Sequence, residues 1–100
     1  MNYVIEQRKS LKIRPRRARQ GREVDGVSHI PLIHGDGECF VGARWVYSRD
    51  RSIAIGDKLI VGEIPGEVVA TKEFIPVGTM VGFAMSKLKG RRCFVHVDPR

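Results

Sequence analysis

Residues 56–98 read GDKLIVGEIPGEVVATKEFIPVGTMVGFAMSKLKGRRCFVHVD, and in this stretch short apolar runs alternate with Gly- and Pro-containing turns. The segment IPGE at residues 64–67 fits a type II turn, because Pro65 presets φ at its second position and Gly66 accepts the positive φ at its third. The apolar runs between such turns follow period two or are short and solid, which is the pattern of β-strands.

The same pattern extends outward over the rest of the chain, and nowhere do ten residues hold the spacing of an amphipathic helix. We therefore predict an all-β fold, either a small β-barrel or a sandwich, with an extended basic N-terminal arm. The predicted strands are Leu11 to Arg14, Val27 to Ile33, Glu38 to Tyr47, Ser52 to Ile55, Lys58 to Val61, Glu67 to Ala70, Thr79 to Met85 and Arg92 to Val97.

Glycine and proline mark the predicted reversals of the chain, which also include Gly35-Asp36-Gly37 and Lys89-Gly90-Arg91. Gly82 is a different case, because it lies inside a predicted strand between Val81 and Phe83. A glycine there indicates a bulge or the close approach of another backbone, the alternative being a weak edge strand. The residues expected to have structural roles in turns or strand bends are Gly56, Asp57, Pro65, Gly66, Gly78 and Gly82.

Positive charge is concentrated at the N-terminus, where the first 23 residues carry six of the seven net charges of the chain. Residues 24–100 carry ten basic and nine acidic side chains and are nearly neutral. We therefore predict two parts, a basic extended arm at residues 1–23 and a single small β domain at residues 24–100. The basic residues of the arm, expected to bind a partner, are Arg8, Lys9, Lys12, Arg14, Arg16, Arg17, Arg19 and Arg22.

The length and composition of the chain restrict the kinds of protein that it can be. A body of about 77 residues buries only around 60% of the surface of its unfolded chain, so we expect it to depend on partners. No apolar run reaches the length of a membrane span, and the start lacks the apolar run of a secretory signal, so we expect no membrane partner. An Arg-rich start also occurs in organellar targeting segments, but Pro15 interrupts the amphipathic helix that they favour.

Cys39 and Cys93 are the only cysteines, which excludes a disulfide-dense scaffold and leaves a single bridge open. Each precedes Phe-Val, so both suit core strands in which the thiol acts as a small apolar group. A zinc site would have to combine Cys39 with His29, His34 and His96, whose spacing lacks the paired grip of such sites. We predict no metal and no cofactor.

Catalysis is not expected either. Ser48, Asp50, Asp57 and His96 are residue types found in catalytic sites, but none lies in a nucleophile elbow, and no Gly-rich loop carries a phosphate-binding Lys. Asp50 lies between two arginines and is interpreted as a solvated loop charge. We predict that the chain is not an enzyme.

The order of signals from Gly56-Asp57 through Pro65-Gly66 and residues 81–85 to the closing apolar strand at 93–97 resembles a small β module of phage tail-fibre, virion-surface and capsid decoration proteins. The resemblance implies a structural protein of a bacteriophage virion, made in the host cytoplasm, with other virion proteins and copies of itself as partners. It leaves the position open among capsid, neck, baseplate and fibre. In that family the module usually ends a longer chain and has no Arg-rich arm, which favours a building block over a receptor-binding fibre.

Two uses of the arm remain open. In the first, it clamps neighbouring virion subunits, with Arg side chains pairing with carboxylates. In the second, the chain binds nucleic acid, with the arm on phosphates and Trp45, Tyr47 or Phe40 stacking on bases. The near-neutral body argues against the second, as does the alternation of Trp45 with Ala43 and Val41, which indicates a core position. We expect the first.

Overall fold

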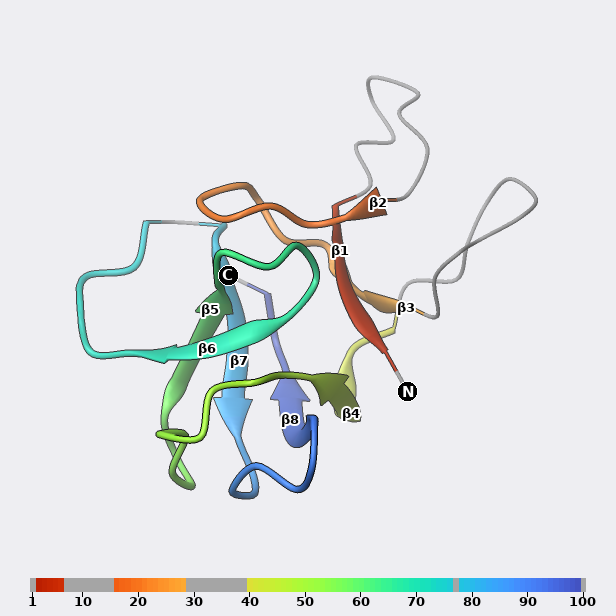
Figure 1. The fold of residues 1–100 in the computed structure, drawn as a ribbon. Coiled ribbons are helices and arrows are strands. Elements are labelled where there is room, and N and C mark those ends of the chain that lie inside the picture. Colours follow the sequence, from red (N-terminus) through yellow and green to blue (C-terminus); the bar gives the residue numbers. More distant parts are fainter. Residues whose placement is uncertain (1, 7–15, 29–39, 77, 100) are drawn as a thin grey trace.

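The computed structural model describes residues 2–6, 16–28, 40–76 and 78–99, which form two antiparallel β-sheets (Figure 1). A three-stranded sheet has the order β2-β1-β3, and a five-stranded sheet has the order β4-β8-β7-β5-β6. These residues contain no helix, so the all-β prediction is confirmed. The strands are β1 (Tyr3–Glu6), β2 (Arg16–Arg17), β3 (Gly26–Ser28), β4 (Gly42–Tyr47), β5 (Lys58–Val61), β6 (Val68–Thr71), β7 (Met80–Ala84) and β8 (Arg92–Val97).

The five-stranded sheet curves until its two edge strands approach each other in front of β7 and β8 (Figure 1). Just beyond β4, Ser48 forms a single parallel bridge with Val68 of β6, and its buried Oγ donates a hydrogen bond to the Val68 carbonyl over 2.7 Å. The prediction of a barrel or sandwich is compatible with these two packed sheets, although the larger sheet does not close into a barrel. Among the described residues, no helix is available to span a bilayer.

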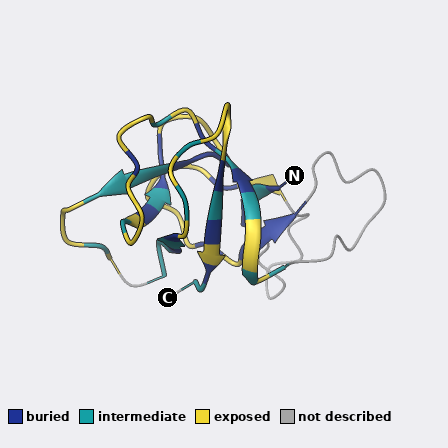
Figure 2. Ribbon diagram, turned by 90° about the horizontal axis from the view of Figure 1, so that it is seen from below, coloured by how far each residue is buried: buried dark blue, intermediate teal, exposed yellow. Residues whose placement is uncertain are grey.

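The core fills the concave side of the curved sheet and the space under β1 and β3. Buried residues alternate with less buried ones along the strands, as Figure 2 shows. Burying each Val or Leu side chain contributes about 1.5–3 kcal/mol, which makes this cluster the main source of stability. Its buried members are Val4, Ala18, Val24, Val27, Val46, Ile53, Leu59, Val61, Val68, Val81, Ala84, Cys93, Val95 and Val97.

The described part of the predicted basic arm packs on the core together with the strands of the larger sheet. Val4, Ile5 and Ala18 are fully buried, and β1 is the central strand of the three-stranded sheet. The prediction considered the charges of this segment and not its apolar residues. These apolar residues pack on the core, while their basic neighbours remain exposed. Arg8, Lys9, Lys12 and Arg14, together with the predicted strand Leu11 to Arg14, lie outside the described residues.

Two predicted strands differ from the observed ones. Residues 52–55 form turns, because the carboxylates of Asp50 and Asp57 accept hydrogen bonds from the backbone amides of Ser52 and Ala54. Such local bonds compete with sheet pairing. The predicted strand Glu38 to Tyr47 is divided at Gly42, whose φ of 82° interrupts the extended chain.

The two sides of that division join different sheets. Before Gly42, Phe40 bridges Val27 of β3, and after it β4 pairs along its full length with β8. The remaining predicted strands agree with β5, β6, β7 and β8 to within one residue at each end. Of the predicted strand Val27 to Ile33, only the first two residues are described, and the Gly35-Asp36-Gly37 turn also lies outside the described residues.

The turn assignments at the quoted stretch are confirmed. Gly56, Gly66 and Gly78 have φ values of 90°, 82° and 87°. The Glu67 amide donates to the Ile64 carbonyl over 3.1 Å, which closes the type II turn around Pro65 and Gly66.

Gly82 lies where two backbones approach closely, as its position in the strand indicated. β7 contains a bulge, because Leu59 pairs with Gly82 while the next residue, Ile60, pairs with Met80. A Cβ added to Gly82 would overlap the carbonyl oxygen of His96 on β8 and lie 3.1 Å from the Cα of Val97. No side chain fits there without separating β7 from β8.

We expect Gly82→Ala to lower the free energy of unfolding by more than about 1 kcal/mol, because the β7–β8 pairing must open to admit the methyl group. Chemical denaturation monitored by circular dichroism measures the loss. Gly90→Ala is the control, since Gly90 also has a positive φ of 63° but nothing within 4 Å of the added atom. Equal losses in the two variants would contradict the close-approach explanation.

Candidate functional site

The convex side of the five-stranded sheet carries several apolar side chains among polar ones such as Lys58 and Thr71. Outward positions alternate with the buried core positions of β5, β6 and β7, and all of them remain partly or fully exposed. Met85, just after β7, continues this face and is 45% exposed. The apolar sheet face is defined here as Ile60, Val69, Met80, Phe83 and Met85.

A strip of aromatic rings continues from this face across β8 and β4 to β1. Trp45 pairs with Phe94, and their ring centroids are 5.0 Å apart. Two residues along β4, Tyr47 stacks on Tyr3 of β1 with centroids 4.3 Å apart. These four residues, Tyr3, Tyr47, Trp45 and Phe94, are partly exposed and form what we call the aromatic strip.

Cations lie against the rings of the aromatic strip. The guanidinium of Arg92 is 4.8 Å from the centre of the Trp45 ring, and the Lys89 ammonium is 5.9 Å from it. At the other end, the Arg17 guanidinium lies 3.7 Å from the Tyr3 ring centre. Cation–π contacts of this kind hold the charged groups beside the ring faces.

The charge of residues 24–100 is unevenly distributed along the sequence, although it nearly cancels in sum. Residues 40–49 and 78–97, which include β4, β7 and β8, contain six Lys or Arg and no Asp or Glu. The rest of residues 24–100 therefore holds four of the ten basic side chains and all nine acidic ones. The sequence argument against nucleic acid used the sum and missed this separation.

Trp45 also corrects the sequence interpretation, because it lies on the partly exposed strip and not in the core. The core residue of this part of β4 is Val46, which is fully buried, and Val41 is 56% exposed. Sequence reasoning did not single out Phe94, Lys89 or Arg92. The absence of acidic residues from position 74 to position 97 was the signal that could have found them.

Three of the four described arginines of the predicted arm, Arg16, Arg17 and Arg19, contact partners within the molecule. Arg16 Nε donates to Oε1 of Glu6, whose side chain is 3% exposed, and Arg19 lies 3.6 Å from the same oxygen. Oε2 of Glu6 is buried and has no hydrogen-bond partner in the described structure. Arg22 is exposed on the loop after β2. The predicted role of these residues in binding a partner remains a prediction.

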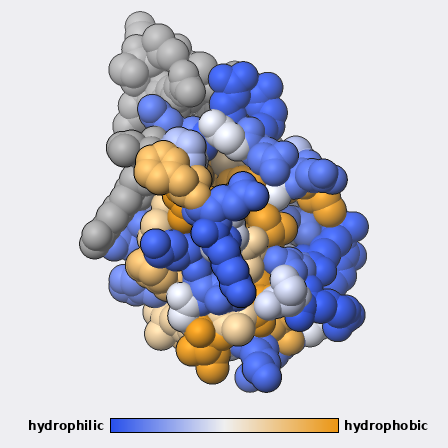
Figure 3. All heavy atoms as spheres, turned by 90° about the vertical axis from the view of Figure 1, so that its left-hand side faces the viewer, coloured by the Kyte–Doolittle hydropathy of each residue, from blue (hydrophilic) through white to orange (hydrophobic). Residues whose placement is uncertain are grey.

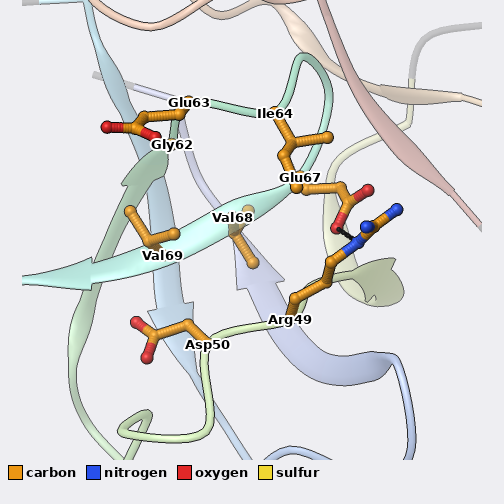
Figure 4. A pocket seen from close by; sticks show the side chains of 8 residues that line it. All are labelled: Arg49, Asp50, Gly62, Glu63, Ile64, Glu67, Val68 and Val69. Atoms are coloured by element: carbon orange, nitrogen blue, oxygen red, sulfur yellow. Dashed lines mark hydrogen bonds and ion pairs between the residues drawn. The ribbon is translucent and has the colours of Figure 1, made fainter.

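A hollow of about 270 Å³ lies between the loop after β4 and the β5–β6 connection (Figure 4). Gly62, Ile64, Val68 and Val69 contribute much of its lining, and an Arg49–Glu67 ion pair of 3.1 Å lies at one side, as the dashed line in Figure 4 shows. The ion pair satisfies both charges, so the hollow offers a ligand mainly apolar contact.

Asp50 beside this hollow is a structural residue and not the solvated charge that its position between two arginines indicated. Its carboxylate accepts hydrogen bonds from the Ala70 amide at 2.8 Å and from the amide and hydroxyl of Ser52. Burial raises the pKa of the Asp50 carboxyl, but these hydrogen bonds outweigh it and leave the pKa below its ordinary value. Asp50 therefore ties the loop after β4 to the edge of β6.

The other sequence candidates for chemistry lie apart. Ser48 is buried and bonded to β6, Asp57 closes a turn, and His96 is exposed in the middle of β8. Within the described ranges, no three His, Cys, Asp or Glu side chains gather as metal ligands. His29, His34 and Cys39 lie outside those ranges.

Cys93 is a free, buried thiol and a member of the core, as its apolar context predicted. Burial raises the pKa of the Cys93 thiol, although a hydrogen bond to Ser86 acts in the opposite direction. The thiol therefore remains protonated and unreactive near neutral pH.

Exposed apolar side chains also occur on the loops. Phe74, in the connection from β6 to β7, is 91% exposed beside a second hollow of about 200 Å³, and Ile55 is 70% exposed. Figure 3 shows the side of the molecule that is on the left in Figure 1, where hydrophobic residues lie in patches among hydrophilic ones.

No protein-family model, curated protein or solved structure matches this chain.

We expect Asp50→Asn to lower the free energy of unfolding at neutral pH by about 1 kcal/mol, since the carboxylate is partly exposed and its bonds are screened. A depressed folded-state pKa stabilises the fold above the ordinary value of 3.8 and loses that effect as pH falls through the folded pKa. The difference between wild type and variant should therefore shrink in acid. Denaturation at several pH values measures it, with exposed Glu73→Gln as control. A difference independent of pH would contradict this role.

Proposed function

We propose that this chain is a non-enzymatic structural subunit that assembles with copies of itself and with other proteins in a larger particle, of the kind formed by bacteriophage virion proteins. The observation that carries the proposal is the apolar sheet face, where five partly or fully exposed apolar side chains lie at outward positions of β5, β6, β7 and its end, beside the polar Lys58 and Thr71. Large exposed apolar patches on small proteins mark interaction sites.

The dimensions of the fold support the same function. A small domain buries a limited share of its surface, so covering a sheet face with a neighbouring subunit adds stability that the isolated chain lacks. The resemblance of residues 56–98 to phage virion modules makes a virion the particle that we propose, and the position within it stays open.

The test substitutes the centre of the apolar sheet face. The double variant Ile60→Thr/Phe83→Thr keeps β-forming residues on β5 and β7 while it removes the apolar contact surface. We expect the wild-type chain to self-associate in sedimentation velocity experiments at micromolar to submillimolar concentration. We expect the double variant to associate at least about tenfold more weakly, because buried apolar anchors contribute most of the binding energy of an interface.

Val41→Thr is the matched control, because Val41 is an exposed apolar residue just before β4, which β8 separates from the strands of the apolar sheet face. It should leave self-association unchanged, and circular dichroism should show the same fold for all three chains. A wild-type chain that stays monomeric over this range, or a double variant that associates as the wild type does, would overturn the proposal.

A further inference from the structure

The aromatic strip offers a second interaction that does not depend on the apolar sheet face. Cations lie against two of its four rings: Arg92 and Lys89 lie against Trp45, and Arg17 lies against Tyr3. Arg92 also pairs in register with Tyr47, so its guanidinium lies at the junction between the two ring pairs of the strip. Ring faces and positive charges are thus presented together along one line.

Charge complementarity defines the partner of this strip as a polyanion. The strands that carry most of it, β4 and β8, contain no acidic residue, and neither does the β7–β8 connection. The cations beside the rings of the strip, Arg17, Lys89 and Arg92, are all exposed to solvent. They can therefore contact an anion without a desolvation penalty for a buried charge.

The aromatic rings select nucleic acid among polyanions. An acidic protein surface needs cations alone, whereas partly exposed rings next to cations can stack on bases while the cations contact phosphates. In a duplex the base faces are already stacked on one another, so only an unpaired strand can use the rings. Arg side chains beside the rings add cation–π contacts to the same stack.

We propose that the aromatic strip binds single-stranded nucleic acid. Bases stack on the partly exposed rings of Trp45 and Phe94. Arg92 and Lys89 contact the phosphates that flank these bases, because the two cations already lie at the Trp45 ring. These phosphate contacts come from Lys89 and Arg92 instead of the predicted basic arm at residues 1–23, which separates this proposal from the sequence-based hypothesis.

Trp45 is the only tryptophan of the chain, so its fluorescence reports directly on stacking. We expect a short oligothymidylate to quench Trp45 emission as it binds. With a fluorescein-labelled oligothymidylate followed by anisotropy, Trp45→Leu should weaken binding by about tenfold. Trp45→Phe, which keeps a ring, should restore most of the affinity. Thermal unfolding checks that each variant is folded.

The cations are tested by matched pairs. Lys89→Gln/Arg92→Gln should reduce the steepness of the log–log salt dependence by about 1.4, from two lost phosphate contacts on a single strand. Arg51→Gln/Lys72→Gln removes the same charge from exposed positions off the strip and should change affinity less than twofold.

Several outcomes would overturn the proposal. They are an absence of Trp45 quenching, equal weakening by the two charge pairs, and equal binding of duplex and single strand. Displacement by polyglutamate as effective as displacement by unlabelled oligothymidylate would assign the strip to an acidic protein instead. The apolar sheet face variant Ile60→Thr/Phe83→Thr should bind oligothymidylate as the wild type does, so failure of this inference and failure of the proposed function are distinguishable.

Discussion

A ring of three backbone hydrogen bonds links β1 to Ala18 and to the turn at residues 64–67. The Val4 amide donates to the Gly66 carbonyl at 2.8 Å, the Gly66 amide to the Ala18 carbonyl at 2.8 Å, and the Ala18 amide to the Val4 carbonyl at 2.9 Å. The ring closes only if Gly66 keeps its positive φ and lacks a side chain, because a Cβ there would lie 3.0 Å from Tyr3. The β1 strand covers the core by means of these bonds, so the turn at residues 64–67 positions the second sheet.

The aromatic strip depends on the same ring of bonds. Tyr3 precedes Val4, and its stacking on Tyr47 requires β1 to lie beside β4. The Asn2 amide donates to the Trp45 carbonyl at 3.1 Å, and the Tyr47 amide donates to the Asn2 carbonyl at 3.0 Å, so the backbone of β4 is held on both sides of Val46. The aromatic strip contains residues of both sheets, so the complete strip forms only while β1 stays docked beside β4.

The curved sheet could be predicted from residues 56–98 because the signals there are local. Pro65-Gly66, Gly78 and the period-two runs each act within a few residues, and β5 and β8 were found with their observed bounds. The close approach at Gly82 could also be predicted, since a strand-interior glycine has few other causes.

Interactions distant in sequence could not be predicted in this way. The burial of Val4 and Ile5 depends on a turn some 60 residues away, and their four-residue strand is too short to stand out beside eight basic neighbours. The conversion of residues 52–55 from strand to turn depends on the Asp50 carboxylate, which also bonds Ala70 on another strand. Trp45 was wrongly predicted to lie in the core, because alternation defines two faces of the strand without showing which one is buried. Val41 and Ala43 share the more exposed side with Trp45, and Val46 is the buried residue.

The fold pairs the charges of this chain differently from what their distribution along the sequence suggested. The excess of arginine near the N-terminus suggested an arm with free cations, yet Glu6 binds Arg16 and lies close to Arg19, and Tyr3 packs against Arg17. Meanwhile the nearly neutral remainder separates its charges, with six cations and no acid on residues 40–49 and 78–97. A segment's net charge therefore says little about its partner until the fold shows which charges are already paired and which lie on one face. In this protein Arg17, Lys89 and Arg92 lie beside aromatic rings, and the proposed binding surface rests on that coincidence rather than on the total charge.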